Sequence, residues 1–181
     1  MEASTEACRA SGPRSNGPRH AGRRRRTIVF RPLDKAGYGV EVLDLLQRLV
    51  KSPGLYRGRG DGMESGPFIA RIQVTPIVRG RAVVLDYEAY SDSQGLQHVE
   101  HTVLTAGEGG RLELHVACLE LPGVVRFLEV RPGVFSAYDG PMPARILITV
   151  PTEGSLTYGW WWSRDEADPR EQSRAEVRRT S

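Results

Sequence analysis

Cysteine is scarce in this sequence, and long apolar runs are missing. Only two cysteines, Cys8 and Cys118, occur in 181 residues, which excludes a disulfide framework and predicts a free buried thiol at Cys118. No stretch approaches the length of a membrane-spanning helix, and the N-terminus has no apolar segment of the secretory type. We therefore expect a soluble cytoplasmic protein without a membrane span.

The positive charge is concentrated in the first 26 residues. This segment has seven arginines, two acidic residues and a net charge of +5, with almost no large apolar side chain. The rest of the chain has 18 basic and 20 acidic residues, so its net charge is about −2. We predict a disordered basic tail over residues 1–26 and one domain over residues 27–181. Nucleic acid is not an expected partner, except for weak contact through the arginines of the tail.

The periodicity of the chain changes at Gly54. Before it, apolar residues over 40–50 follow the helical period, and Ser52-Pro53-Gly54 ends the helix. After it, short runs rich in β-branched and aromatic residues alternate with turn residues. Such short connections pair neighbouring strands antiparallel, and a sheet of this size closes to hide its edges. The sequence predicts an all-β fold, an up-and-down antiparallel β-barrel of about ten strands with one N-terminal lid helix. The expected strands are 54–62, 67–78, 81–91, 97–106, 111–120, 124–131, 133–138, 144–151, 155–163 and 172–179.

The first expected strand is rich in glycine. It runs Gly-Leu-Tyr-Arg-Gly-Arg-Gly-Asp-Gly, so that Gly54, Gly58, Gly60 and Gly62 share one face with Tyr56. A face almost without side chains suits a strand that bends sharply or that another backbone approaches closely. The segment is not a nucleotide-binding loop, because such a loop opens a helix and here the helix comes first.

This glycine pattern, with one helix before it and about nine meandering strands after it, resembles the calycin barrels. Over roughly residues 40–180 it looks most like the intracellular fatty-acid-binding-protein-like and nitrobindin branch. The resemblance implies that Tyr56, in place of the usual Trp, closes the base of the barrel, and that Arg174 or Arg178 of the last strand stacks on it. Nitrobindin-like members bind haem through a histidine near the start of the last strand. The resemblance places Gln172 there, a poor iron ligand, so we expect no cofactor and keep a haem or nitric-oxide protein as an alternative.

Three histidines lie in the expected barrel. His98 and His101 differ by an odd number and so face opposite sides of a strand, while His101 shares its face with Val99 and Val103. We therefore expect His101, together with His115 of the next strand, to point inward. If they meet near an acidic residue, an acid–base or metal site becomes possible, and an isomerase, cyclase or hydrolase is a second alternative. No Ser-His-Asp order, zinc spacing or phosphate loop supports an enzyme, so this alternative is not the preferred one.

Aromatic residues suggest what the interior holds. Tyr158, Trp160 and Trp162 alternate along one strand and, with Tyr87, would form an apolar wall with polar tips. We predict that these four residues, with His101 and His115, line a site for a small hydrophobic or amphipathic, lipid-like ligand. The same aromatic residues would instead fill the core if the barrel is not hollow. Trp161 faces outward in this pattern and marks a possible homodimer face.

Overall fold

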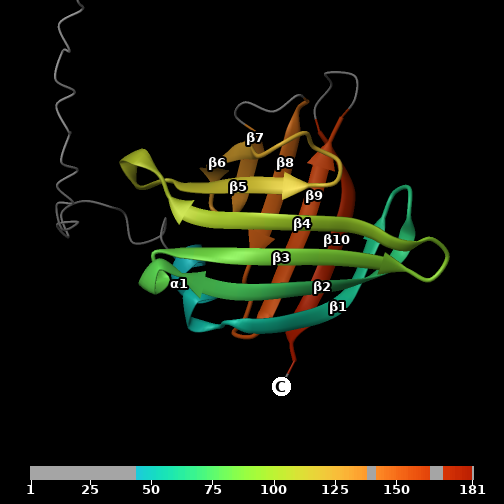
Figure 1. Ribbon diagram of the computed structural model, residues 1–181, viewed down its shortest axis with the longest axis horizontal. Coiled ribbons are helices and arrows are strands. Elements are labelled where there is room, and N and C mark those ends of the chain that lie inside the picture. Colours follow the sequence, from blue (N-terminus) through green and yellow to red (C-terminus); the bar gives the residue numbers. More distant parts are fainter. Residues whose placement is uncertain (1–43, 138–141, 164–168, 181) are drawn as a thin grey trace, which may run out of the picture. The chain divides into compact units, whose positions relative to one another are not determined.

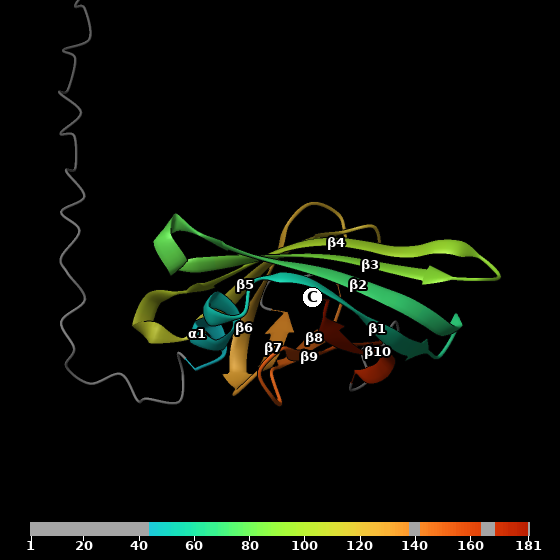
Figure 2. The same cartoon turned by 90° about the horizontal axis from the view of Figure 1, so that it is seen from below.

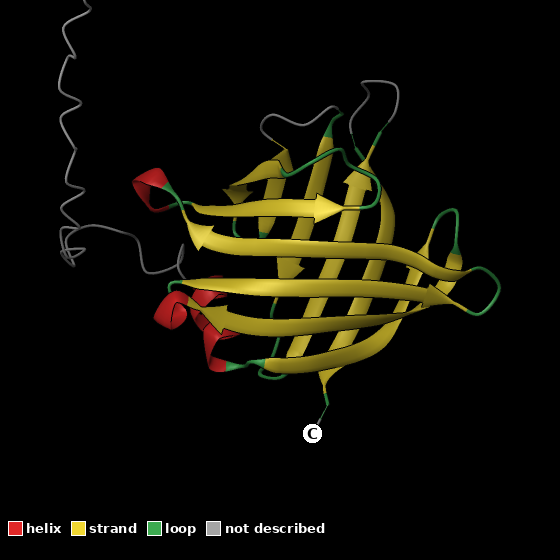
Figure 3. Ribbon diagram, in the orientation of Figure 1, coloured by secondary structure: helices red, strands yellow, loops and turns green. Residues whose placement is uncertain are grey.

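The computed structural model describes residues 44–137, 142–163 and 169–180, and it shows a closed antiparallel barrel of ten strands with one α-helix before the first strand (Figures 1 and 3). The predicted tail, residues 1–26, lies outside the described residues. No helix in the described part is long and apolar enough to cross a membrane. The elements are α1 (Asp44–Lys51), β1 (Gly54–Gly62), β2 (Gly66–Ile77), β3 (Ala82–Ser91), β4 (Gly95–Ala106), β5 (Leu112–Cys118), β6 (Val125–Arg131), β7 (Val134–Ala137), β8 (Ala144–Thr149), β9 (Ser155–Trp162) and β10 (Arg170–Arg179), with short 3-10 turns η1 (Val78–Gly80) and η2 (Glu108–Gly110).

Each strand pairs with the next one along the chain, and β10 returns to pair with β1. This order follows from connections too short for any crossover. The predicted all-β barrel is confirmed, and every predicted strand boundary lies within two residues of the observed one. Strands β2 to β5 cross β8 and β9 at a steep angle in Figure 1, and Figure 2 shows the space between the two layers edge-on. The barrel is therefore flattened, with two facing walls.

The glycines of β1 form the seam at which the barrel closes. A Cβ atom at Gly58 would lie 1.9 Å from the backbone oxygen of Glu176 on β10. A Cβ at Gly60 would lie 2.2 Å from the ring of Phe68. The glycine-rich strand is therefore needed for close approach of a neighbouring backbone and of a ring, as its side-chain-free face predicts.

Helix α1 covers one end of the barrel. Its three leucines, Leu45, Leu46 and Leu49, are buried against the strands, as its amphipathic pattern requires. The Arg48 guanidinium donates to the carbonyl oxygen of Val150, the residue that follows β8, over 3.0 Å. The buried Tyr56 hydroxyl donates to the Ser52 carbonyl just after the helix, over 2.7 Å. The predicted lid helix is thus attached to this end by polar contacts as well as by its apolar stripe.

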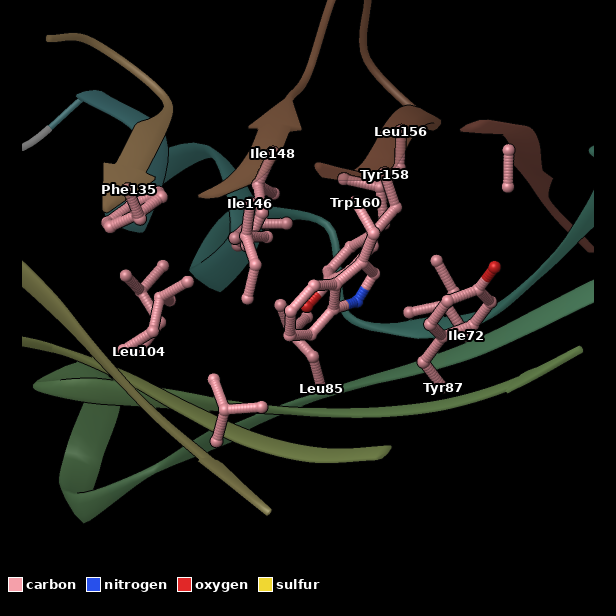
Figure 4. Close-up of a cluster of buried hydrophobic side chains, with 14 of the residues drawn as sticks. Ile72, Leu85, Tyr87, Leu104, Phe135, Ile146, Ile148, Leu156, Tyr158 and Trp160 are labelled. Carbon is pink, nitrogen blue, oxygen red and sulfur yellow. The ribbon is translucent and has the colours of Figure 1, made fainter. Parts of the chain in front are cut away.

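Side chains from both walls meet in one continuous core. Tyr158 and Trp160 extend from β9 toward Leu85 and Tyr87 on β3, which Figure 4 shows in close-up. The Tyr87 and Tyr158 rings lie 5.1 Å apart, and the Phe127 and Trp160 rings lie edge to face at 5.7 Å. The middle of the barrel is packed, so any cavity must lie toward an end.

Candidate functional site

A cavity of about 520 Å³ occupies the end of the barrel opposite α1. Hairpin turns alternate between the two ends of the barrel. The opening of the cavity, its mouth, is therefore surrounded by the β1–β2 turn, the β3–β4 turn and the residues that follow β5. The volume lies within the range of small-molecule sites in proteins, roughly 300–1,000 Å³. Its lining comprises Glu64, Ser65, Phe68, Tyr87, Ala89, Gln94, Gln97, His98, Cys118, Glu120, Leu121, Met142, Ala144, Trp160, Trp162, Gln172 and Ser173.

Three of the four predicted aromatic residues line this cavity. Tyr87 comes from β3, and Trp160 and Trp162 come from β9. Tyr158, the fourth, is buried beneath the cavity and does not form part of its lining. Burial, together with the negative charges of Glu100 and Glu120, raises the pKa of Tyr87 above its ordinary value. Tyr87 therefore offers a neutral hydroxyl on an apolar ring at neutral pH.

Glu100 lies below the floor of the cavity and is the most notable polar residue of the interior. It is 2% exposed, and it accepts hydrogen bonds from four side chains. The Trp160 indole donates to Glu100 Oε2 over 2.8 Å, and the His98 ring nitrogen Nε2 lies 3.1 Å from the same oxygen. The hydroxyls of Thr102 and Tyr158 both donate to Oε1. A carboxylate accepts about four such bonds, so this set satisfies it fully.

His98 connects the buried carboxylate to the mouth. Its Nδ1 lies 2.8 Å from Oε1 of Glu120, whose side chain is half exposed, while Nε2 faces Glu100. Burial lowers the pKa of His98, but the hydrogen bonds to Glu100 and Glu120 and their charges outweigh burial and raise this pKa to about 9. Burial raises the pKa of Glu120, and the hydrogen bond and charge of His98 more than reverse this, so the pKa ends below its ordinary value. At neutral pH the pair is an imidazolium and a carboxylate.

The stability of the fold is expected to fall as the pH rises from 6.5 to 9. The folded pKa of His98, about 9, lies above the unfolded value of 6.5. Protonated His98 therefore contributes about 3 kcal/mol to the free energy of unfolding. This contribution is fully present below pH 6.5 and is lost as the pH passes through 9. Urea unfolding at several pH values up to 9 measures this loss. His98→Gln should flatten the profile in that range, and an equally steep profile in this variant would contradict the assignment.

Cys118 lies beside this pair and is a free thiol, as the cysteine count predicts. Burial, together with the negative charges of Glu120 and Glu100, raises the pKa of its thiol to about 12. The reactive thiolate is therefore rare at neutral pH. Cys118 therefore contributes a small, largely protonated side chain to the lining of the cavity.

The prediction that His101 and His115 point inward is wrong. The His101 side chain is 58% exposed and its Nδ1 lies 2.6 Å from Oδ1 of Asp86 on the outer surface. His115 is 41% exposed, with its Nε2 3.7 Å from Glu113. Because inward positions alternate along a strand, Glu100 and Thr102 occupy the interior side of β4, and His101 must face out. An acid–base site built on His101 and His115 has no support in this geometry.

The predicted arginine partner of Tyr56 is also wrong. Tyr56 is buried inside the barrel, whereas Arg174 and Arg178 are exposed on the outer face of β10. Arg179 is the residue directly opposite Tyr56 in the strand register, one position beyond the predicted Arg178. The guanidinium of Arg174 instead lies 5.6 Å from the centre of the Trp161 ring, a cation–π contact on the outer surface.

Sequence reasoning missed the acidic part of the site. The alternation of the strand places His98 only on the side opposite His101, and no sequence motif assigns a role to Glu100 or Glu120. The sequence does contain a pattern that indicates it. Apolar residues alternate along β5 at Leu112, Leu114 and Val116, which are all buried, so His115 between them must face outward. Extending that register to β4 across the pair Thr102 and Val116 places Glu100 inside.

No protein-family model and no curated protein sequence matches the chain. Solved structures do match. The crystal structure of Rv2717c from M. tuberculosis aligns with a TM-score of 0.56 and 15% identity over 76% of this chain and 98% of that one. The S-type phycobiliprotein lyase CPES from Guillardia theta aligns with a TM-score of 0.51 and 14% identity over 78% and 93%. The chain shares a closed antiparallel β-barrel fold with these two proteins. At these identities the likeness concerns the fold alone.

Proposed function

We propose that this calycin-like barrel binds a small hydrophobic or amphipathic molecule in the cavity opposite α1. The observation that carries the proposal is a 520 Å³ cavity lined by four aromatic residues and other apolar residues together with polar ones, of which His98 and Glu120 are held in position by hydrogen bonds. Affinity would come from burial of apolar ligand surface, at about 25 cal/mol per Å². The likeness of the fold to that of a phycobiliprotein lyase is consistent with a barrel that binds a small molecule.

Three of the residues that line the cavity, His98, Glu120 and Trp160, are held in place by hydrogen bonds before any ligand arrives. Glu100 fixes the Trp160 indole, and the same carboxylate orients His98, which in turn fixes Glu120. A wall that is already ordered loses little side-chain entropy when a ligand binds. This arrangement therefore supports a binding site more than a packing defect.

We infer that no histidine of this cavity is available to bind haem iron. His98 is the one histidine among the described residues that line the cavity. Carboxylates contact both of its ring nitrogens, and its pKa of about 9 keeps the ring protonated. A protonated imidazole has no lone pair for iron. Gln172, which the resemblance places at the family's ligand position, donates its amide to the Trp162 carbonyl over 3.0 Å. We therefore favour an organic ligand over a haem bound through a histidine.

Filling the cavity is expected to abolish binding of an apolar probe. Ala144 is buried and lines the cavity, so Ala144→Trp would place an indole where the ligand sits. The neutral dye Nile red should bind the unmodified protein with increased fluorescence, and Ala144→Trp should weaken this binding by at least about tenfold, because it removes the buried contact area.

A matched variant separates loss of the site from added bulk. Ala106 is exposed at the end of β4 and does not line the cavity, so Ala106→Trp adds the same ring outside the site. It should leave dye binding unchanged. Equal binding by Ala144→Trp and the unmodified protein, or no dye binding by either, would contradict the proposed function.

A further inference from the structure

The charged groups that line the cavity are mainly acidic. Glu64 and Glu120 contribute carboxylates and His98 contributes one imidazolium. No lysine or arginine occurs among the lining residues in the described ranges 44–137, 142–163 and 169–180. Glu100 adds a further carboxyl group just below the floor. The potential inside a cleft with such walls favours cations, because low-dielectric walls focus the field of the charges that line them.

The one cation in the wall is not available to bind an anion. An imidazolium has two N–H donors, and those of His98 point to Glu100 at 3.1 Å and to Glu120 at 2.8 Å. A ligand carboxylate would have to displace one of these carboxylates or lie beside it. Proteins that bind carboxylates commonly provide an arginine fork instead, and the described lining has none.

Aromatic faces provide the second requirement for binding a cation. Tyr87 and Trp160 line the cavity from facing walls, and Trp162 and Phe68 lie in the same lining. The face of an aromatic ring attracts ammonium groups, more strongly when they are removed from water. Carboxylates at the mouth and rings along the wall thus match a molecule with an apolar body and a positive head.

We propose that the ligand of this cavity is an apolar molecule with a positively charged nitrogen, and that the site discriminates against carboxylates such as fatty acids. The proposal rests on the proposed function, since it names the chemical class of the ligand. Glu120 faces the positive head together with Glu64, and the aromatic rings contact the head and the body. Fatty-acid binding, which the fold alone would suggest, is the outcome that this charge pattern opposes.

Three probes with one apolar chain test the proposal. Dodecyltrimethylammonium, dodecanol and dodecanoate share a twelve-carbon chain and differ only in the charge of the head. Each probe is tested for competition with Nile red for the cavity of the full-length protein. The concentrations stay below micelle formation, and near-ultraviolet circular dichroism monitors the fold. We expect the ammonium to bind about tenfold more tightly than dodecanoate, with dodecanol between them, and we expect this ratio to shrink in high salt.

Removing the carboxylates identifies the source of the preference. Glu64→Gln combined with Glu120→Gln keeps the side-chain shapes and the Glu120 hydrogen-bond acceptor, and it should bring the ammonium-to-carboxylate ratio to within about twofold. Glu64→Gln alone, at an exposed turn, should reduce the ratio in part without any risk to folding. Glu153→Gln makes the same charge change in the turn before β9, outside the cavity lining, and should leave the ratio unaltered.

The results separate this inference from the proposed function. If dodecanol competes and dodecanoate binds as tightly as the ammonium, the cavity binds apolar molecules and the inference about charge is wrong. A preference for ammonium that persists in the double variant would likewise overturn it. If no probe competes and Nile red itself does not bind, both the proposed function and the inference fail.

Discussion

Replacing Glu100 by glutamine is expected to lower the free energy of unfolding by about 3–5 kcal/mol, the loss typical of a broken buried ion pair. Four donors converge on this carboxylate, from His98, Thr102, Tyr158 and Trp160. A glutamine offers one acceptor oxygen, and its amide nitrogen would point at groups that are themselves donors. At least one buried donor would remain without a partner, and the imidazolium of His98 would keep only Glu120.

A second measurement distinguishes the loss of the Glu100 hydrogen bonds from a general disturbance of core packing. Without Glu100, the pKa of His98 should fall from about 9, because burial opposes the charged form and one of its two supporting carboxylates is gone. A proton NMR titration of the imidazole measures this shift, and urea unfolding measures the stability. Asp86→Asn makes the same change in the exposed pair with His101 and should cost less than about 1 kcal/mol. A Glu100→Gln loss no larger than that control would refute a role for the buried network.

The fold could be predicted largely from local patterns. Turn residues at short intervals, together with the glycine face of Gly58 and Gly60, predict strands, their order and a place where the barrel closes. These features are local because an up-and-down barrel pairs each strand with its sequence neighbour. Among the strands that the structure describes, β1 and β10 form the one long-range pairing, and it follows from the need to remove sheet edges.

The site could be predicted only where apolar alternation and function agree. On β9, Tyr158 and Trp160 are both large and inward-facing, so the pattern identified the correct face. On β4 the rule that the apolar face of a strand points inward gives the wrong face. The apolar Val99 and Val103 lie on the outer face, and Glu100 lies inside. Burying a carboxylate is favourable only if donors satisfy it, and those of Tyr158 and Trp160 lie 58 and 60 residues away along the chain. Alternation within one strand carries no information about such partners.

Replacing Gly58 by alanine is expected to destabilise the barrel by about 3 kcal/mol or more, or to prevent its closure. The added Cβ would lie 1.9 Å from the Glu176 carbonyl oxygen and 2.7 Å from the Val177 Cα. Both are backbone atoms of β10, so no side-chain rotation removes the clash. The strand β1 would have to move away from β10, which breaks hydrogen bonds along the pairing that closes the barrel.

Gly62→Ala is the matched control for this substitution, because it lies on the same strand and its Cβ would meet mainly the Ser65 hydroxyl, at 2.3 Å. A serine side chain can rotate away, and alanine in a strand is otherwise favoured over glycine by about 0.5–1 kcal/mol. We therefore expect little net change for Gly62→Ala and a large loss for Gly58→Ala in urea unfolding and in refolding yield. Similar stabilities for the two variants would show that β1 and β10 can separate without loss. In that case the seam would not hold the walls of the cavity at a fixed distance, and a preformed binding site would lose its structural basis.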